Sequence, residues 1–301
     1  MLKLWGTKLL LQTLVETANH IKFTDLGLGP VAIDLGFFQI RWYSLSYLVM
    51  ILLGYWYLLK LIRIPGSPIS RVHADDLIMY MTLGVILGGR FGYILFYDRD
   101  LLAFDKFYRV WEGGMSLHGG TLGVLFALFI FTRLHKLSYL RVCDYIACCT
   151  PFGLVLVRLA NFVNGELWGK ETDLPWAIRF PEVIGGMPAL GPPRHPSQLY
   201  EAVLEGVLMA IVLWPMFWKT AARYKPGLLW GTGLIIYGCA RFTMEFFRQP
   251  DAQLAWLPEQ YGLSMGQILS TPMILLGLFL VLTAKGRRAR VEPIMGGQSV
   301  A

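Results

Sequence analysis

Charged residues are scarce in this sequence of 301 residues: lysine, arginine, aspartate and glutamate make up 16% of it, whereas hydrophobic residues make up 55%. Soluble globular domains carry about 25% charged residues. The composition therefore excludes that class and predicts a polytopic membrane protein whose charges lie in loops. The net charge of +7 comes without a basic stripe interleaved with aromatic residues, so positive cytoplasmic loops explain it better than a nucleic-acid partner.

Cysteine is also rare, and the four cysteines (Cys143, Cys148, Cys149 and Cys239) all fall in apolar runs. They form no C-x-x-C pair, and no histidine is placed to complete a zinc site. The sequence also lacks a P-loop and a dinucleotide fingerprint. We therefore predict no metal, nucleotide or redox cofactor, and we interpret the cysteines as small buried hydrophobic residues.

Long apolar runs are present instead. A helix that crosses a membrane needs about 20 apolar residues, and seven segments meet this need: 42–61, 76–97, 116–133, 142–162, 197–219, 227–247 and 265–284. No internal repeat or linker separates them. The predicted fold is an all-α integral membrane protein, a single domain of seven transmembrane helices with an external loop or head region.

The basic residues between the spans predict the orientation, because cytoplasmic loops carry an excess of lysine and arginine. The loops after the first, third, fifth and seventh spans hold thirteen such residues, and those after the even spans hold seven. The odd-numbered loops are therefore predicted to be cytoplasmic, with the N-terminus outside and the C-terminus inside.

Three segments lie outside the spans. Residues 1–23 begin with a basic, partly apolar stretch too short to cross a membrane, and we predict an interfacial extension. Residues 24–41 are rich in glycine and are expected to be irregular or briefly extended. Residues 165–196 contain six prolines and are predicted to form an external loop or lid, because loops of this length are often functional. Residues 285–301 are predicted to be a cytoplasmic tail.

The stretch Arg158-Leu-Ala-Asn161-Phe-Val-Asn164-Gly-Glu166 breaks the apolar pattern. An arginine at the centre of a membrane helix costs about 2.5–3.5 kcal/mol on insertion scales, so such residues mark functional sites. In the predicted topology, further polar groups fall in the same outer layer: Tyr43, Arg90, His118, Glu201, Glu205, Arg241 and Glu245. Asp144, near the cytoplasmic side, is interpreted as an ordinary acid at the start of its own helix.

Two interpretations of this layer are open. The arginines can simply pair with Glu201, Glu205 or Glu245, or they can also bind a ligand. Polar contacts between membrane helices contribute only about 0.6 kcal/mol each, so packing alone does not need Arg90, Arg158 and Arg241 at one depth. The guanidinium group donates two parallel hydrogen bonds and stays charged, which suits phosphate. We therefore predict an anionic lipid as ligand.

A glycine-rich stretch, Gly113-Gly-Met-Ser-Leu-His118-Gly-Gly120, opens the third span. Its glycines, with Gly123 and those around Arg90, allow helices to approach closely. His118 is placed to titrate near neutral pH beside the arginines, so a structural role and a catalytic role both stay open. Ser116 and His118 lie two residues apart and do not face each other on a helix, which argues against an intramembrane serine protease.

The sequence resembles the bacterial prolipoprotein diacylglyceryl transferases in six motifs that occur in one order over about residues 24 to 284. They are Gly88-Gly-Arg90-Phe-Gly-Tyr93, the glycine-rich stretch above, Arg158 to Gly169, Arg194-His-Pro-Ser-Gln198-Leu-Tyr-Glu201, Tyr237-Gly-Cys-Ala-Arg241 and Glu245-Phe-Phe-Arg248-Gln-Pro-Asp251. Ala160 stands where the family usually has glycine, and it keeps a small residue there.

This resemblance implies seven transmembrane helices in the bacterial inner membrane and a reaction without a cofactor. The diacylglyceryl group of phosphatidylglycerol passes to the lipobox cysteine thiol of a prolipoprotein, and glycerol phosphate is released. The catalytic residues implied are His118, Arg158 and Arg241. The substrate-binding residues implied are Tyr43, Arg90, Asn161, Asn164, Glu166, Glu201, Tyr237 and Glu245.

Physical chemistry suggests roles for these residues. His118 is a candidate base for the thiol, although a local positive field can activate a thiol as well. Arg158 and Arg241 would stabilise charge on the leaving phosphate. The rival hypothesis is a transporter or flippase of an anionic lipid or metabolite, which would place its site near the middle of the bilayer between inverted repeats.

Overall fold

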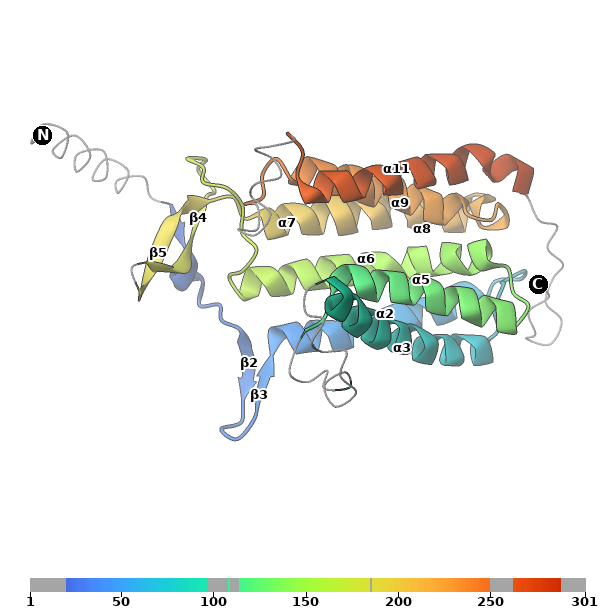
Figure 1. The fold of residues 1–301 in the computed structure, drawn as a ribbon, viewed down its shortest axis with the longest axis horizontal. Helices are drawn as coiled ribbons and strands as arrows, with labels where there is room; N and C mark the ends of the chain where they lie inside the picture. The colour runs from blue at the N-terminus through green and yellow to red at the C-terminus, as the bar shows by residue number, and fades with distance from the viewer. Residues whose placement is uncertain (1–19, 97–107, 109–113, 185, 250–261, 288–301) are drawn as a thin grey trace, which may run out of the picture. The chain divides into compact units, whose positions relative to one another are not determined.

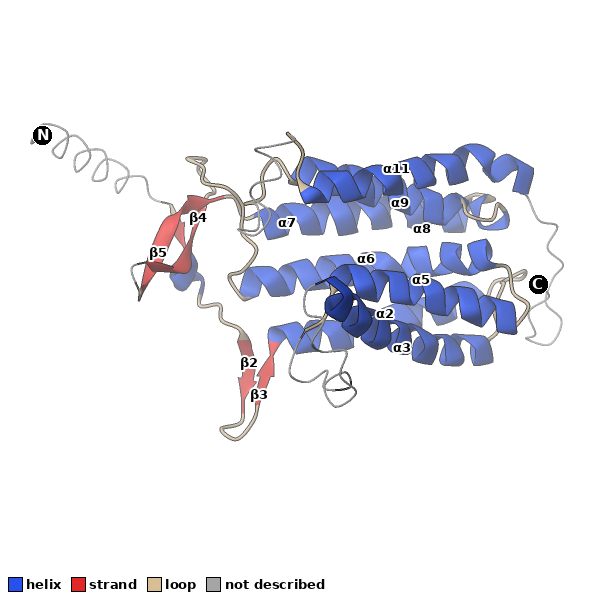
Figure 2. Cartoon of the chain, in the orientation of Figure 1, coloured by secondary structure: helices blue, strands red, loops and turns tan. Residues whose placement is uncertain are grey.

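The computed structural model describes residues 20–96, 108, 114–184, 186–249 and 262–287, and most of these residues are helical (Figures 1 and 2). They fall into two compact units. Unit 1 draws on the described residues within 1–48, 154–205 and 239–271, and unit 2 on those within 49–153, 206–238 and 272–301. The strands and the second half of the predicted fourth span belong to unit 1.

The helices follow the predicted spans. They are α2 (Trp42–Ile62), α3 (Arg71–Phe96), α5 (Leu117–Leu134), α6 (Tyr139–Val163), α7 (Ser197–Glu201), α8 (Leu208–Lys219), α9 (Leu228–Met244) and α11 (Met265–Thr283), with 3-10 turns at Phe23–Leu26, Ala222–Tyr224 and Ala284–Arg287. Among the described residues, five helical stretches are long and apolar enough to cross a membrane, and His118–Leu134 is a shorter apolar helix. The chain is therefore a mostly helical membrane protein.

Helix ends differ from the predicted spans where polar residues extend or stop a helix. α3 begins five residues before predicted residue 76, and α9 ends at Met244, three residues before 247. Hydropathy marks only the apolar part of a helix, whereas hydrogen bonding sets its ends. α11 begins at Met265 as predicted. There Ser264 Oγ accepts from the Gln267 amide and Gln267 Oε1 accepts from the Ser264 amide, a capping box.

The fifth predicted span is one helical stretch with an irregular turn. α7 continues through a π-helical segment, Ala202–Val207, into α8. Pro196 precedes the first helical residue, Ser197. Single π-helical turns are rare and are frequent at functional sites. The irregular turn begins directly after Glu201 and contains Glu205, so it carries or adjoins both acidic residues of this span.

Five short strands occur among the described residues. The two within residues 24–41 agree with the brief extended structure expected there, whereas the other three were not predicted. β1 (Ile21–Lys22) pairs in parallel with β4 (Ile178–Ile184), which pairs antiparallel with β5 (Met187–Arg194). β2 (Val31–Asp34) and β3 (Gln39–Arg41) form a separate antiparallel hairpin. The segment 165–196, predicted as a loop, thus contains a hairpin, and the end of the predicted extension 1–23 is a strand. The rest of that extension, residues 1–19, and residues 288–301 of the predicted tail lie outside the described residues.

An aromatic cluster explains why the sheet of unit 1 forms. Phe23 packs against Phe162 of α6 and Phe180 of β4, with ring centroids 5.9 and 5.4 Å away. Phe23 and Phe180 are buried. Burying large aromatic side chains contributes strongly to stability. The cluster therefore attaches the strands to the end of α6.

The end of β5 leads directly into α7, and side-chain contacts fix this junction. Arg194 Nε donates to Glu182 Oε1 at 2.8 Å, and its guanidinium lies 4.3 Å from the centroid of the Trp168 ring. Ser197 Oγ donates to the carbonyl of Leu167 at 3.0 Å. These contacts set the position of the first turn of α7.

Within unit 2, α3 and α5 meet through glycines, as predicted. A Cβ atom at Gly88 would lie 2.5 Å from the carbonyl oxygen of Gly119, and one at Gly84 would lie 2.6 Å from that of Gly123. Both separations are too short for any side chain, so the two backbones touch at these positions. Small residues allow this approach in membrane helices.

We expect Gly119→Ala to destabilise the protein by about 1–3 kcal/mol, because overpacking forces the backbones apart. The new methyl would meet the carbonyl of Gly88 and lie 2.8 Å from the Cα of Gly92. Gly120→Ala is the matched control, since its nearest neighbour is the carbonyl oxygen of Val85 at 3.6 Å. Thermal unfolding of both purified variants in detergent checks this, and equal melting temperatures would contradict it.

Two smaller predictions need correction. The Asp144 carboxylate does not serve its own helix but accepts from the backbone amides of Gly227 and Trp230, at 2.7 and 2.8 Å, at the start of α9. Orphan amides at a helix N-terminus attract such acids. Among the cysteines, Cys143 and Cys148 are buried, whereas Cys239 is exposed. Apolar sequence context alone does not distinguish these helix faces.

Candidate active site

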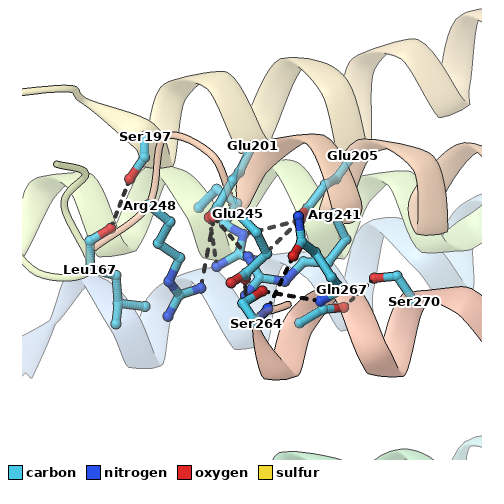
Figure 3. Close-up of polar contacts among 12 residues, drawn as sticks. Leu167, Ser197, Glu201, Glu205, Arg241, Glu245, Arg248, Ser264, Gln267 and Ser270 are labelled. Carbon is cyan, nitrogen blue, oxygen red and sulfur yellow. Dashed lines mark hydrogen bonds and ion pairs between the residues drawn. The ribbon is translucent and has the colours of Figure 1, made fainter. Parts of the chain in front are cut away.

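Three arginines and three glutamates of unit 1 form one group of ion pairs, which we call the arginine cluster. Figure 3 labels five of its members: Glu201, Glu205, Arg241, Glu245 and Arg248. Arg158 lies on α6, Glu201 on α7, Glu205 on the π-helical segment and Arg241 on α9, while Glu245 and Arg248 follow the end of α9. Segments far apart in the chain therefore supply the cluster.

Glu201 is the shared partner of the cluster. Its Oε2 lies 2.9 Å from Arg158 Nη1, in an ion pair without the alignment of a hydrogen bond. Its Oε1 accepts from Arg241 Nη1 at 3.2 Å and lies 3.7 Å from Arg248 Nη1. One carboxylate thus contacts three guanidinium groups.

The other two carboxylates each hold one arginine. Glu205 Oε2 accepts from both Nε and Nη2 of Arg158, at 3.2 and 3.1 Å. Glu245 Oε1 forms an ion pair with Arg241 Nη2, four residues earlier. Each arginine of the cluster is therefore fixed by at least one carboxylate, as the pairing interpretation predicted.

These ion pairs are largely buried. The side chains of Glu201 and Glu205 are fully buried, and those of Arg158, Arg241 and Arg248 are 14–17% exposed. A buried carboxylate is costly unless it is paired and hydrogen-bonded. The cluster therefore keeps the guanidinium groups charged, oriented and partly accessible. Such a preorganised array stabilises negative charge that develops on a phosphate.

A second polar group adjoins the same helix end. Asn161 and Asn164 each donate from Nδ2 to Glu166 Oε1, at 2.9 and 3.1 Å. Gln198 Nε2 donates to the backbone carbonyl of Glu166. Tyr43 also lies in unit 1, and its hydroxyl is 3.3 Å from the hydroxyl of Tyr47.

The structure thus brings most of the predicted site residues together in unit 1. These are Tyr43, Arg158, Asn161, Asn164, Glu166, Glu201, Arg241 and Glu245. His118, Arg90 and Tyr237 belong to unit 2. His118 is an exposed residue in the first turn of α5, and Arg90 is buried and donates from Nη1 to the carbonyl of Gly114 at 3.4 Å.

Two residues of these groups were quoted in motifs but not predicted as site residues. Arg248 lies beyond the end of α9, in a turn whose backbone pairs with Gly169. Its spacing of seven residues from Arg241 and three from Glu245 is that of one helical face, so a periodicity signal was present, although α9 itself ends at Met244. Gln198 stands three residues before Glu201, and this spacing places both on one side of a helix. That signal was present in the sequence.

Among the described residues, helices that can cross a membrane and partly accessible guanidinium groups fixed by buried carboxylates define a membrane protein with a buried cluster of ion pairs. The sequence model of the family described as prolipoprotein diacylglyceryl transferase matches residues 30–283. The chain belongs to this family, which confirms the resemblance found in the motifs, and it is a transferase.

Relatives with the name phosphatidylglycerol–prolipoprotein diacylglyceryl transferase match almost the whole chain. The protein of Erythrobacter litoralis is 53% identical over 276 residues, which cover 92% of this chain and 96% of the relative. That of Zymomonas mobilis is 47% identical, with 90% and 96% covered. That of Rhodospirillum rubrum is 46% identical, with 90% and 97% covered.

Proposed function

We propose that this protein transfers the diacylglyceryl group of phosphatidylglycerol to the cysteine thiol of the lipobox in prolipoproteins. Membership in the family and the names of its relatives support this activity. The observation that carries the site assignment is the buried carboxylate of Glu201, which holds Arg158 and Arg241 from two different helices. These two arginines would bind the lipid phosphate between them.

The reaction exchanges one bond for another. The cysteine sulfur attacks the carbon of the diacylated glycerol that is bonded to the phosphate oxygen. A carbon–sulfur bond forms there, and the bond between that carbon and the phosphate oxygen breaks. Glycerol phosphate leaves, and the thiol proton passes to His118 and from there to solvent or to the leaving phosphate. Negative charge accumulates on the phosphate in the transition state, where the guanidinium groups are most effective.

The remaining predicted residues receive supporting roles in this proposal. His118 would take the thiol proton, because free cysteine has a pKa of about 8.5 and is mostly protonated at neutral pH. Arg90 and Tyr237 would contact the lipid or the peptide. Glu201, Glu205 and Glu245 would position arginines and not exchange protons, since each is already bound to a guanidinium group.

We further propose seven spans in the bacterial inner membrane, with α5 and α9 as the third and sixth, and with the arginine cluster toward the outer face. A reporter enzyme fused after Arg290 is expected to be active only in the cytoplasm, because the loops predicted to be cytoplasmic carry most of the basic residues. A reporter fused into the loop after α3 should instead report a periplasmic location. Periplasmic activity of the first fusion would refute the orientation.

The activity is tested with purified protein, phosphatidylglycerol vesicles and a synthetic lipobox peptide. Mass spectrometry should detect a diacylglyceryl thioether on the cysteine and an equal amount of glycerol phosphate. A peptide with serine in place of that cysteine is the control and should stay unmodified. Movement of lipid between leaflets without a thioether would instead indicate the transporter hypothesis.

A further inference from the structure

Three carboxamide side chains surround Glu166, and each of them donates a hydrogen bond to it from its nitrogen. Asn161 and Asn164 donate their amide hydrogens to its carboxylate, and Gln198 donates to its backbone carbonyl. Each of these acceptors lacks a hydrogen to give, so each carboxamide must turn its nitrogen toward Glu166. The three amide orientations are therefore fixed by one residue.

The opposite end of each carboxamide has no partner. Asn161 Oδ1, Asn164 Oδ1 and Gln198 Oε1 are buried atoms without a hydrogen bond among the described residues. Asn161 is 3% exposed and Gln198 is fully buried. Buried polar atoms are normally hydrogen-bonded, and each exception needs an explanation. Here three exceptions occur around one residue, and all three are acceptors.

We propose that these oxygens accept hydrogen bonds from the two hydroxyl groups of the glycerol headgroup of the lipid, with one hydroxyl hydrogen shared between two of the three oxygens. The inference rests on the proposed function and identifies the part of the substrate that this group reads. A ligand that satisfies only acceptors must bring several donors, and the headgroup of phosphatidylglycerol ends in two hydroxyl groups. Asn161, Asn164 and Gln198 therefore select a hydroxylated headgroup.

The position of Asn161 connects this group to the phosphate. Asn161 follows Arg158 by three residues on α6, so the two side chains lie on one face of the helix. The headgroup glycerol is bonded directly to the phosphate that Arg158 would bind. A phosphate at Arg158 therefore brings the hydroxyl groups to the side of Asn161.

Charge favours a hydroxyl over an ammonium group at this place. The three acceptors are neutral amides, and the Glu166 carboxylate already accepts two amide hydrogens. An ethanolamine headgroup would also bring donors, but its ammonium group would lose its hydration against acceptors that carry no charge to offset it. Peptide amides of the prolipoprotein are donors too, but no covalent link ties them to the phosphate.

The test compares lipids that differ only in the headgroup. Wild-type protein is supplied with phosphatidylglycerol or with phosphatidylpropanol, which keeps the phosphate and the acyl chains but has no headgroup hydroxyl. We expect kcat/KM for thioether formation to fall at least about tenfold with phosphatidylpropanol, because buried acceptors are left unpaired. Equal rates would overturn this inference alone, and so would equal use of phosphatidylethanolamine. No product from any lipid would refute the proposed function instead.

A pair of matched variants assigns the effect to these residues. Gln198→Met keeps the size of the side chain and removes the acceptor, so the preference for phosphatidylglycerol should shrink at least about threefold. Gln267→Met is the control, because Gln267 is also buried but its Oε1 already accepts from Ser264. Its preference should stay at the wild-type value. If Gln198→Met lowers the rate equally for both lipids, the residue only supports Glu166 and the assignment is wrong.

Discussion

Arg241→Ala is expected to lower kcat/KM for diacylglyceryl transfer by about 10³-fold, the scale of losing a charged donor that acts on developing negative charge. Arg241 contacts Glu201 and Glu245 and is 17% exposed, so it combines a fixed position with access to a ligand. Arg241→Lys should recover little of the rate, because an ammonium group does not reproduce the planar fork of guanidinium. The measurement is steady-state thioether formation in detergent.

Arg179→Ala is a suitable control for Arg241→Ala. Arg179 lies in the same unit, on β4, and its Nε donates to the backbone carbonyl of Gly191 at 3.0 Å. The Arg179→Ala variant should form thioether at a rate within about threefold of wild type, since a substitution away from the arginine cluster changes the site little. A normal rate in Arg241→Ala, with normal folding, would remove the phosphate-binding argument.

Glu201→Gln is the second change with a large expected effect. The substitution keeps the shape of the side chain but removes the charge that three arginines share. Loss of one partner of a buried ion pair costs about 3–5 kcal/mol, so the melting temperature should fall by at least about 5 °C. Turnover should fall about 10²-fold or more, because the guanidinium groups lose their common anchor. Thermal unfolding and thioether formation are measured on the same preparation.

Glu182→Gln provides the comparison for Glu201→Gln. Glu182 accepts from one arginine, Arg194, at 2.8 Å, and its side chain is 18% exposed. Partly exposed pairs contribute less than buried ones, so the fall in melting temperature should be less than half as large. Equal falls in melting temperature in the two variants would mean that contact with three arginines instead of one adds nothing to stability.

The sequence predicted the helices well because the membrane imposes long apolar runs. Trp42 and Met265 begin helices at the predicted residues, since an apolar run and a helix start coincide there. The β4–β5 hairpin was not predicted, because Pro181, Pro188 and Gly191 are typical of loops. Proline is tolerated on edge strands and at bulges. β5 is an edge strand, and the register of β4 shifts beside Pro181.

The candidate site was predicted in part, for a physical reason. Arg158, Glu201 and Arg241 were found because charges in apolar helices are costly and therefore conspicuous. Arg248 was not assigned to the site, although its spacing from Arg241 and Glu245 is that of one helical face. Its position in the structure is set by the turn after α9 and by backbone pairing with Gly169, which the sequence does not show. The unpartnered oxygens around Glu166 likewise depend on side-chain orientation, which the sequence does not encode locally.

The order of charges along the chain has a consequence for biogenesis. In the proposed topology, α6 enters the bilayer first with Arg158, the α7–α8 stretch follows with Glu201 and Glu205, and α9 arrives last with Arg241. Signs alternate, so each newly synthesised segment neutralises its predecessor. Until its acidic partners emerge from the ribosome, α6 carries an uncompensated cation. Its cost is below the value of about 2.5–3.5 kcal/mol for a helix centre, because Arg158 lies near the end of α6. Insertion of the α7–α8 stretch then supplies Glu201 and Glu205 as partners and offsets this cost.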